Sequence, residues 1–253
     1  MIAVIGMGVV GRSQARMFGP AVTYDIRQDE PYPSEEIAGC DFAVVAVGTP
    51  QSPGGGADLS QVRQAIGVLP AGVPVLLRST VPPGTTDTLM AAHPGLLIAH
   101  APEFLTERDG GPWPESADVP FMILGGRPEA REYFRSRLPG FFPGGIYECT
   151  ALEAELAKYT SNLYWAARVT FVNELSRICA AAGADWEDVR AMWLADERVS
   201  PAYTSMAGFG PGFGGACWPK DLAALIAASE ELGYEALFLR SVEDANHWFR
   251  EGR

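Results

Sequence analysis

A cysteine at the end of a glycine-rich segment is the clearest candidate for covalent chemistry in this sequence. The segment GFGGAC ends at Cys217, and WPKD follows it at residues 218–221. We expect a helix to begin just after Cys217, and both a helix N-terminus and a nearby ammonium favour the nucleophilic thiolate. A lone cysteine is more often an inert buried residue, so the residue types alone leave both interpretations open.

Lysine is rare in this chain, which draws attention to the two positions that carry it. The sequence has 17 arginines and only two lysines, Lys158 and Lys220. Arginine is effectively always protonated, whereas a buried lysine can lose its proton and act as an acid or a base. Composition bias explains such a pattern equally well, so the counts leave both explanations open.

A stripe of polar residues follows one face of the helix predicted over residues 151–182. The stripe consists of Glu155, Lys158, Asn162 and Asn173. Their spacing brings them to the same side of a helix with 3.6 residues per turn. Such residues on an otherwise apolar helix are either solvated or line a cleft, and the spacing alone favours the solvated interpretation.

The N-terminus carries a glycine pattern typical of dinucleotide-binding turns. The string GMGVVG follows a short apolar run and precedes a predicted helix. In such a turn Gly6 permits the tight bend, Gly8 lets a pyrophosphate approach the backbone, and Gly11 lets helix and strand pack closely. Asp25 ends the second apolar run, where a carboxylate can bind the ribose hydroxyls and would repel a 2′-phosphate. The pattern predicts NAD, although Arg27 could in principle hold the phosphate of NADP.

These residues require a parallel sheet and a set of helices to position them. Short apolar runs predict strands at residues 2–5, 21–24, 42–47, 75–77, 96–99 and 121–124. Helices are expected over 128–138 and 151–182, from a cap at Asp185 through Leu194, and on either side of Gly233. The fold class is therefore α/β: a Rossmann dinucleotide-binding domain at 1–148, then an all-helical dimerisation and substrate domain at 149–253 that carries the cysteine loop.

Composition excludes several classes of function. The 253 residues include 31 acidic and 19 basic ones, a net charge of −12, which argues against nucleic acid and anionic membrane surfaces. We find no apolar run long enough to span a membrane and expect no signal peptide. The four cysteines lack the spacing of a disulfide framework or a zinc site, so no metal is expected. We therefore expect a soluble cytoplasmic protein.

Five motifs in order along the chain resemble those of the UDP-glucose/GDP-mannose 6-dehydrogenase family. They are GMGVVG at 6–11, STVPPGTT at 79–86, PEFLTE at 102–107, AKYTSN at 157–162 and GFGGACWPKD at 212–221. The resemblance implies oxidation of a primary alcohol to a carboxylate in two NAD-dependent steps, through a cysteine thiohemiacetal and thioester. It also implies a homodimer formed through the helix at 151–182.

The resemblance implies a role for each matching residue. Cys217 would be the nucleophile and Glu103 the acid/base of thioester hydrolysis, while Lys158 and Asn162 would hold the reacting oxygen, and Thr80 and Asp221 the catalytic water. Cofactor contacts are implied for Gly6, Gly8, Val9, Val10, Gly11, Asp25, Val47, Gly48, Thr49, Pro50, Ser79, Thr80, Glu107 and Lys220. Substrate contacts are implied for Glu103, Phe104, Leu105, Lys158, Asn162, Arg198, Tyr203, Gly212, Phe213 and Gly214, with Arg198 lent to the neighbouring subunit.

The chain also departs from the family pattern. Family members have a third domain for the nucleotide of the sugar, and we expect this short form to lack it and to act on a smaller alcohol carrying a phosphate or phosphonate. Ala101 stands where an Asn usually precedes PEFL, and Arg108 replaces a usual Gly. Two alternatives stay open: a two-electron 3-hydroxyacid-type dehydrogenase that uses Lys158 and Asn162 without Cys217, and a non-catalytic NAD-binding subunit.

Overall fold

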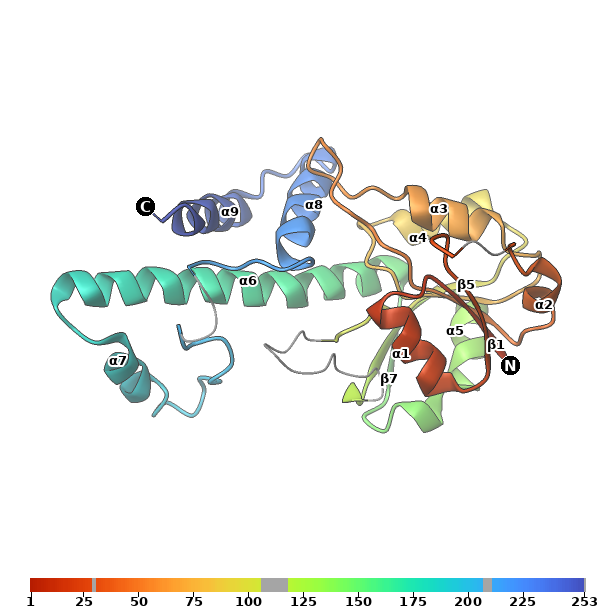
Figure 1. The fold of residues 1–253 in the computed structure, drawn as a ribbon, viewed down its shortest axis with the longest axis horizontal. Coiled ribbons are helices and arrows are strands. Elements are labelled where there is room, and N and C mark those ends of the chain that lie inside the picture. The colour runs from red at the N-terminus through yellow and green to blue at the C-terminus, as the bar shows by residue number, and fades with distance from the viewer. Residues whose placement is uncertain (29–30, 106–117, 207–210, 253) are drawn as a thin grey trace. The chain divides into compact units, whose positions relative to one another are not determined.

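The chain folds into two compact units. A computed structural model describes residues 1–28, 31–105, 118–206 and 211–252 (Figure 1). The first unit comprises Met1–Ser52 with Ala57–Lys158, and the second comprises Pro53–Gly56 with Tyr159–Arg253. In the described ranges, no helix is both long and apolar enough to cross a membrane.

The first unit is built on a seven-stranded sheet with the order β2-β1-β3-β4-β5-β6-β7. The strands are β1 (Ile2–Ile5), β2 (Ala21–Tyr24), β3 (Ala43–Val45), β4 (Val75–Leu77), β5 (Ile98–His100), β6 (Met122–Gly126) and β7 (Ile146–Cys149). The β5–β6 pair is antiparallel and the other pairs are parallel. The fold class expected from the sequence is confirmed.

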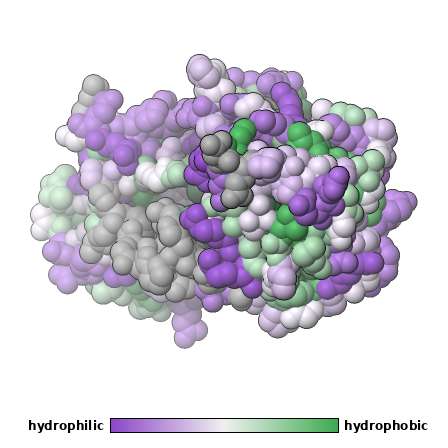
Figure 2. Space-filling view, turned by 45° about the vertical axis from the view of Figure 1, so that its right-hand side comes forward, coloured by the Kyte–Doolittle hydropathy of each residue, from purple (hydrophilic) through white to green (hydrophobic). Residues whose placement is uncertain are grey.

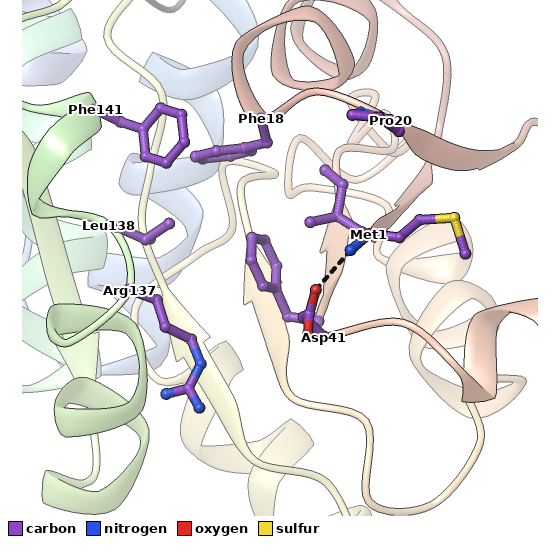
Figure 3. A pocket seen from close by; sticks show the side chains of 9 residues that line it. Met1, Phe18, Pro20, Asp41, Arg137, Leu138 and Phe141 are labelled. Atoms are coloured by element: carbon purple, nitrogen blue, oxygen red, sulfur yellow. Dashed lines mark hydrogen bonds and ion pairs between the residues drawn. The ribbon is translucent and has the colours of Figure 1, made fainter.

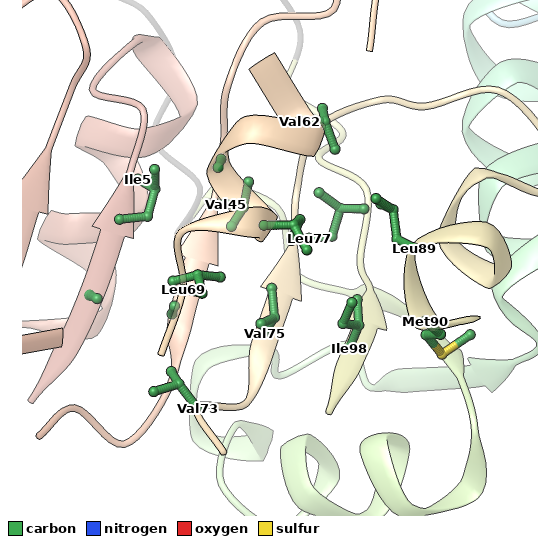
Figure 4. Packing of buried hydrophobic residues seen from close by; sticks show 14 of the residues in the cluster. Ile5, Val45, Val62, Leu69, Val73, Val75, Leu77, Leu89, Met90 and Ile98 are labelled. Atoms are coloured by element: carbon green, nitrogen blue, oxygen red, sulfur yellow. The ribbon is translucent and has the colours of Figure 1, made fainter. Parts of the chain in front are cut away.

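Helices cover both faces of this sheet. On one face lie α1 (Val9–Phe18) and α5 (Pro128–Arg135), and on the other lie α2 (Ser34–Ala38), α3 (Ser60–Gly67) and α4 (Thr85–Ala92). Figure 4 shows strand side chains such as Val45 and Leu77 packed against Val62 of α3 and Leu89 of α4. Because both faces are covered, the strands read as short continuous apolar runs.

Several strand and helix boundaries differ from the sequence prediction. The runs at 96–99 and 121–124 form strands over Ile98–His100 and Met122–Gly126. The run at 42–47 forms a strand only over Ala43–Val45, and β7, which is half exposed, was not predicted. The helix predicted over 128–138 ends at Arg135, because the N–H of Arg137 bonds to the carbonyl of Phe134, only three residues back.

The second unit is helical, apart from the short segment Pro53–Gly56. It contains most of α6 (Ala151–Ala182) and all of α7 (Trp186–Trp193), α8 (Trp218–Glu231) and α9 (Leu237–Arg250). A short 3-10 helix, η2 (Pro139–Phe141), belongs to the first unit. The predicted cap of α7 is confirmed: the Asp185 carboxylate accepts the N–H of Glu187 at 2.7 Å. The division between the units falls inside α6, after Lys158, so the domain boundary at 148/149 stays a prediction.

A cavity of about 380 Å³ lies where β1 and β3 begin (Figure 3). Its walls are Met1, Ile2, Phe18, Pro20, Asp41, Phe42, Arg137, Leu138 and Phe141. Ligands of open parallel sheets bind where the strands end rather than where they begin. This cavity lies at the opposite edge of the sheet from the expected cofactor site. The N-terminal ammonium of Met1 pairs with the Asp41 carboxylate there at 2.6 Å.

Polar residues cover much of the face drawn in Figure 2, and hydrophobic residues show there as small separate areas. Single exposed apolar residues of this kind are normal on protein surfaces.

Candidate active site

The glycine turn after β1 has the geometry that a pyrophosphate needs. Gly6 has φ +92°, and a Cβ added there would lie 2.6 Å from the carbonyl oxygen of Ala46. A Cβ on Gly11 would lie 1.8 Å from the carbonyl oxygen of Gly6, so helix and turn touch backbone to backbone. A Cβ on Gly8 would meet nothing within 4 Å, so the backbone is open at the position expected for the phosphates. The close backbone contacts explain glycine at Gly6 and Gly11, and the role of Gly8 toward a pyrophosphate stays a prediction.

Asp25 follows β2 and fastens the glycine turn. Its buried carboxylate accepts the N–H of Met7 at 2.7 Å. It also accepts the backbone N–H, Nε and Nη2 of Arg27 at 3.0, 2.8 and 2.7 Å, and the Arg27 side chain holds the pKa of Asp25 well below its usual range. Four donors occupy the carboxylate, so a ribose hydroxyl can bind only when the guanidinium, which is 73% exposed, gives up a bond.

Two predicted cofactor-binding stretches are tied together at the ends of β3 and β4. The hydroxyl of Ser79 donates to the carbonyl of Val47, and the hydroxyl of Thr49 donates to the carbonyl of Thr80, both at 2.8 Å. The other end of the motif STVPPGTT, which begins at Ser79, is held by Glu155. Its carboxylate accepts the N–H of Gly84 at 2.6 Å and the N–H and hydroxyl of Thr86 at 2.7 and 2.6 Å. Burial raises the pKa of Glu155 above its usual value, although these hydrogen bonds act in the opposite direction.

Glu103 lies in a buried polar cluster that the sequence analysis missed. Its carboxylate pairs with the guanidinium of Arg78 and accepts the amide of Gln14 at 3.1 Å and the N–H of Phe104 at 2.9 Å. Arg78 is only 3% exposed. Its position directly after an apolar strand is the sequence signal that could have revealed the cluster, because an arginine buried there needs a carboxylate partner. On the neighbouring strand, burial and the charge of Arg78 lower the pKa of His100 to about 3, so this histidine is neutral.

The polar stripe of α6 is buried, so the solvated interpretation was wrong. Glu155, Lys158, Asn162 and Asn173 are all at most 7% exposed. The ammonium of Lys158 lies 5.0 Å from the ring centre of Phe104, within reach of a cation–π contact. A spacing pattern shows which residues share a face but not which segments cover it.

Within the second unit, Asp221 brings three predicted site residues together. Its carboxylate is 1% exposed and accepts the amide of Asn162 at 2.6 Å and the ammonium of Lys220 at 2.5 Å. Its N–H donates to the carbonyl of Cys217 at 2.9 Å in the first turn of α8. Cys217 is exposed and stands at the N-cap of that helix, as expected.

The predicted catalytic and substrate-binding residues, with Lys220, divide between the two units. Thr80, Glu103, Phe104, Leu105 and Lys158 belong to the first, and Asn162, Arg198, Tyr203, Gly212, Phe213, Gly214, Cys217, Lys220 and Asp221 to the second. The Tyr203 ring lies 5.0 Å from Trp165 and 5.1 Å from Trp218, with a backbone φ of +57°. Arg198 is 90% exposed and pairs with Asp196 of its own chain at 2.6 Å. Glu107 lies outside the described residues.

Two domain models of one family match the chain. The NAD binding domain of the UDP-glucose/GDP-mannose dehydrogenase family matches residues 30–138, and the central domain of that family matches residues 152–248. The chain belongs to the UDP-glucose/GDP-mannose dehydrogenase family. The match to the NAD binding domain, together with the open glycine turn, indicates NAD as the cofactor.

Individual relatives agree with this assignment. The chain is 34% identical over 233 residues to a UDP-glucose 6-dehydrogenase of Pseudomonas aeruginosa, covering 84% of this chain and 50% of the relative. It is 32% identical over 222 residues to the UDP-glucose 6-dehydrogenase YwqF of Bacillus subtilis, covering 83% and 49%. The solved UDP-glucose dehydrogenase of Pyrobaculum islandicum aligns with a TM-score of 0.83 at 28% identity, covering 98% of this chain and 68% of that one. The chain thus spans about half the length of the curated relatives it matches.

The Asp25–Arg27 pair leads to a prediction about cofactor choice. Replacing Asp25 by Ala should weaken NAD binding by on the order of tenfold, because a charged acceptor for the ribose and the tie to Met7 are both lost, and should weaken NADP binding far less. Replacing Arg27 by Ala is the matched control, which keeps the carboxylate and should preserve NAD binding. Calorimetric titration of both cofactors measures this, and tighter binding of NADP than of NAD by the unaltered protein would contradict the assignment.

Proposed function

We propose that this protein oxidises a primary alcohol to a carboxylate in two NAD-dependent steps, with Cys217 as the covalent nucleophile. The observation that carries the proposal is the exposed Cys217 at the start of α8. The first turn of α8 also contains the buried Asp221, which bonds to Lys220 and to Asn162 of α6. An exposed thiol at a helix N-terminus has the surroundings of a reactive cysteine rather than of a packing residue.

The proposed chemistry balances with two molecules of NAD, which accepts one hydride in each oxidation. Oxidation of the alcohol gives an aldehyde, and the Cys217 thiolate adds to its carbonyl carbon to give a thiohemiacetal. Loss of a second hydride from the same carbon gives a thioester, and attack by water releases the acid and restores the thiol. One alcohol, two NAD⁺ and one water give one carboxylate, two NADH and three protons.

The other residues that match the family motifs take the remaining roles in this proposal. Lys158 and Asn162, one turn apart on α6, stabilise the negative charge that develops on the reacting oxygen. Glu103 serves as the base for the water that attacks the thioester, with Thr80 and Asp221 positioning that water. The Arg78 guanidinium supplies the charge that lets Glu103 stay buried as a carboxylate.

The substrate class is the finer part of the proposal. Two relatives are named as UDP-glucose 6-dehydrogenases, and they are about twice as long as the matched chain. A smaller alcohol bearing a phosphate or phosphonate, as expected from the sequence, stays a prediction. A panel that contains both UDP-glucose and small phosphorylated alcohols, read out by NADH formation, decides between them.

Substitution of the nucleophile tests the proposed function. Cys217→Ala should remove acid formation and leave at most the aldehyde, because no thioester can form, whereas Cys149→Ala, on β7, should retain both oxidations. Glu103→Gln should accumulate the thioester, seen by intact-protein mass spectrometry as substrate mass added to the chain. If Cys217→Ala makes acid at the full rate, the covalent route is wrong. If the unaltered protein forms one NADH per molecule of a carbonyl product, the two-electron hydroxyacid reaction through Lys158 replaces the proposal.

We also propose that the protein forms a homodimer through α6. Tyr164, Phe171 and Ile178 recur every seven residues on this helix and are 55, 52 and 55% exposed. A seven-residue apolar spacing is typical of a helix that packs along another helix. Tyr164 and Phe171 also line a groove of about 620 Å³, whose other walls are Thr160, Leu163, Ala167, Arg168, Trp193, Leu225, Phe238 and Leu239.

Light scattering tests the dimer. The unaltered chain should show twice its mass of 27.1 kDa, and Phe171→Glu should shift it toward the monomer, because burying the new charge at the interface is costly. Tyr147→Glu is the control, since Tyr147 is 61% exposed on β7 and lies outside both α6 and the groove. A monomer mass that does not change with concentration would refute the proposal.

A further inference from the structure

The glycine-rich segment before Cys217 is held by side chains from two helices. The N–H of Gly212 donates to the Asn173 side chain of α6 at 2.9 Å. The N–H of Phe213 donates to the Asn246 side chain of α9 at 2.7 Å, and the Phe213 carbonyl accepts a bond from Arg250 of α9 at 3.2 Å. Asn173 and Asn246 are 1% and 4% exposed, so these bonds form in the interior of the second unit.

Two glycines of the segment leave room for the α9 side chains. A Cβ on Gly212 would lie 2.5 Å from the Oδ1 of Asn246, and its φ of +74° also favours glycine. A Cβ on Gly214 would lie 2.6 Å from the Nη1 of Arg250. Close approach of α9 therefore accounts for glycine at both positions, without any need for a ligand at them.

The helix that supplies these groups is itself fixed in the second unit. Arg177 of α6 lies over the rings of Trp248 and Phe249, at 4.6 and 4.8 Å from their centres. Phe213 is 1% exposed and packs in a core that includes Leu222 of α8. The segment is thus pinned at Phe213, and only three residues separate this pin from Cys217 at the N-cap of α8.

We propose that Asn246 and Arg250 are positioning residues that set the place of the Cys217 thiol through the backbone of Phe213. This inference rests on the proposed role of Cys217. Both side chains bond to the backbone of Phe213, the anchor from which the short segment leads to the cysteine. Because the environment of the helix N-terminus favours the thiolate, loss of the anchor lowers both the fraction of thiolate and its alignment.

Alkylation of Cys217 by iodoacetamide as a function of pH tests this without any substrate. Asn246→Ala should move the midpoint of the pH–rate profile upward and lower kcat by about tenfold or more, with little change in the binding of NAD. Asn246→Asp keeps an acceptor for the Phe213 N–H beside Arg250 and should restore most of the rate. The rate measured on Cys217→Ala is subtracted, so that only this thiol is followed.

Arg250 provides a second test that does not depend on a buried substitution. Its side chain is exposed, so the variant Arg250→Met should fold. This variant should shift the midpoint of the alkylation profile upward by less than Asn246→Ala does. Arg250→Lys should restore part of the difference. Ser241→Ala, on the exposed side of α9, is the control and should match the unaltered chain in alkylation and thermal unfolding.

The outcomes separate this inference from the proposed function. If Asn246→Ala and Arg250→Met show the alkylation midpoint and kcat of the unaltered chain, the positioning role is wrong while the covalent mechanism stands. If Asn246→Ala fails to fold, an unchanged profile for Arg250→Met contradicts the role and a shifted profile rescued by Arg250→Lys supports it. Acid formation by Cys217→Ala would overturn the proposed function, and the positioning role for catalysis with it.

Discussion

The need to pair every polar group that is buried along α6 organises the regions around that helix. A buried polar side chain without a partner costs on the order of 1–3 kcal/mol, so each member of the stripe must meet a complementary group. Glu155 accepts bonds from Gly84 and Thr86 at the start of α4, Asn162 bonds to Asp221, and Asn173 bonds to the backbone of Gly212. One helix thereby fixes three segments that carry the proposed chemistry, and each unit contains its own part of this arrangement.

Two buried carboxylates extend the same constraint to charge. Glu103 is paired with Arg78, and Asp221 with Lys220, so each cation offsets much of the cost of keeping an ionised group out of water. Removing one member of such a pair leaves an uncompensated buried charge, at a cost of about 3–5 kcal/mol. The pairs therefore hold their carboxylates at fixed positions, which is what a base or a water-positioning group requires.

Local sequence signals predicted the fold well and the partners of the site residues poorly. Apolar runs identified β1, β2 and β4 at their observed bounds, and periodicity identified α6, because these signals lie within a few residues of chain. The strand β7 was missed because its half-exposed residues form no apolar run. The stripe of α6 was misread, and Gln14, Arg78, Asn246 and Arg250 were overlooked, because their partners lie 25 to 89 residues away and no local pattern reports them.

The central claim is that one carbon is oxidised twice while Cys217 holds it. Its most direct measurement is the number of NADH molecules formed per molecule of acid, determined in a single-turnover reaction by absorbance and quantitative mass spectrometry with a substrate from the panel. The account predicts two NADH for each carboxylate and no accumulation of aldehyde. One NADH per molecule of product, with the product remaining at the level of a carbonyl compound, would contradict it.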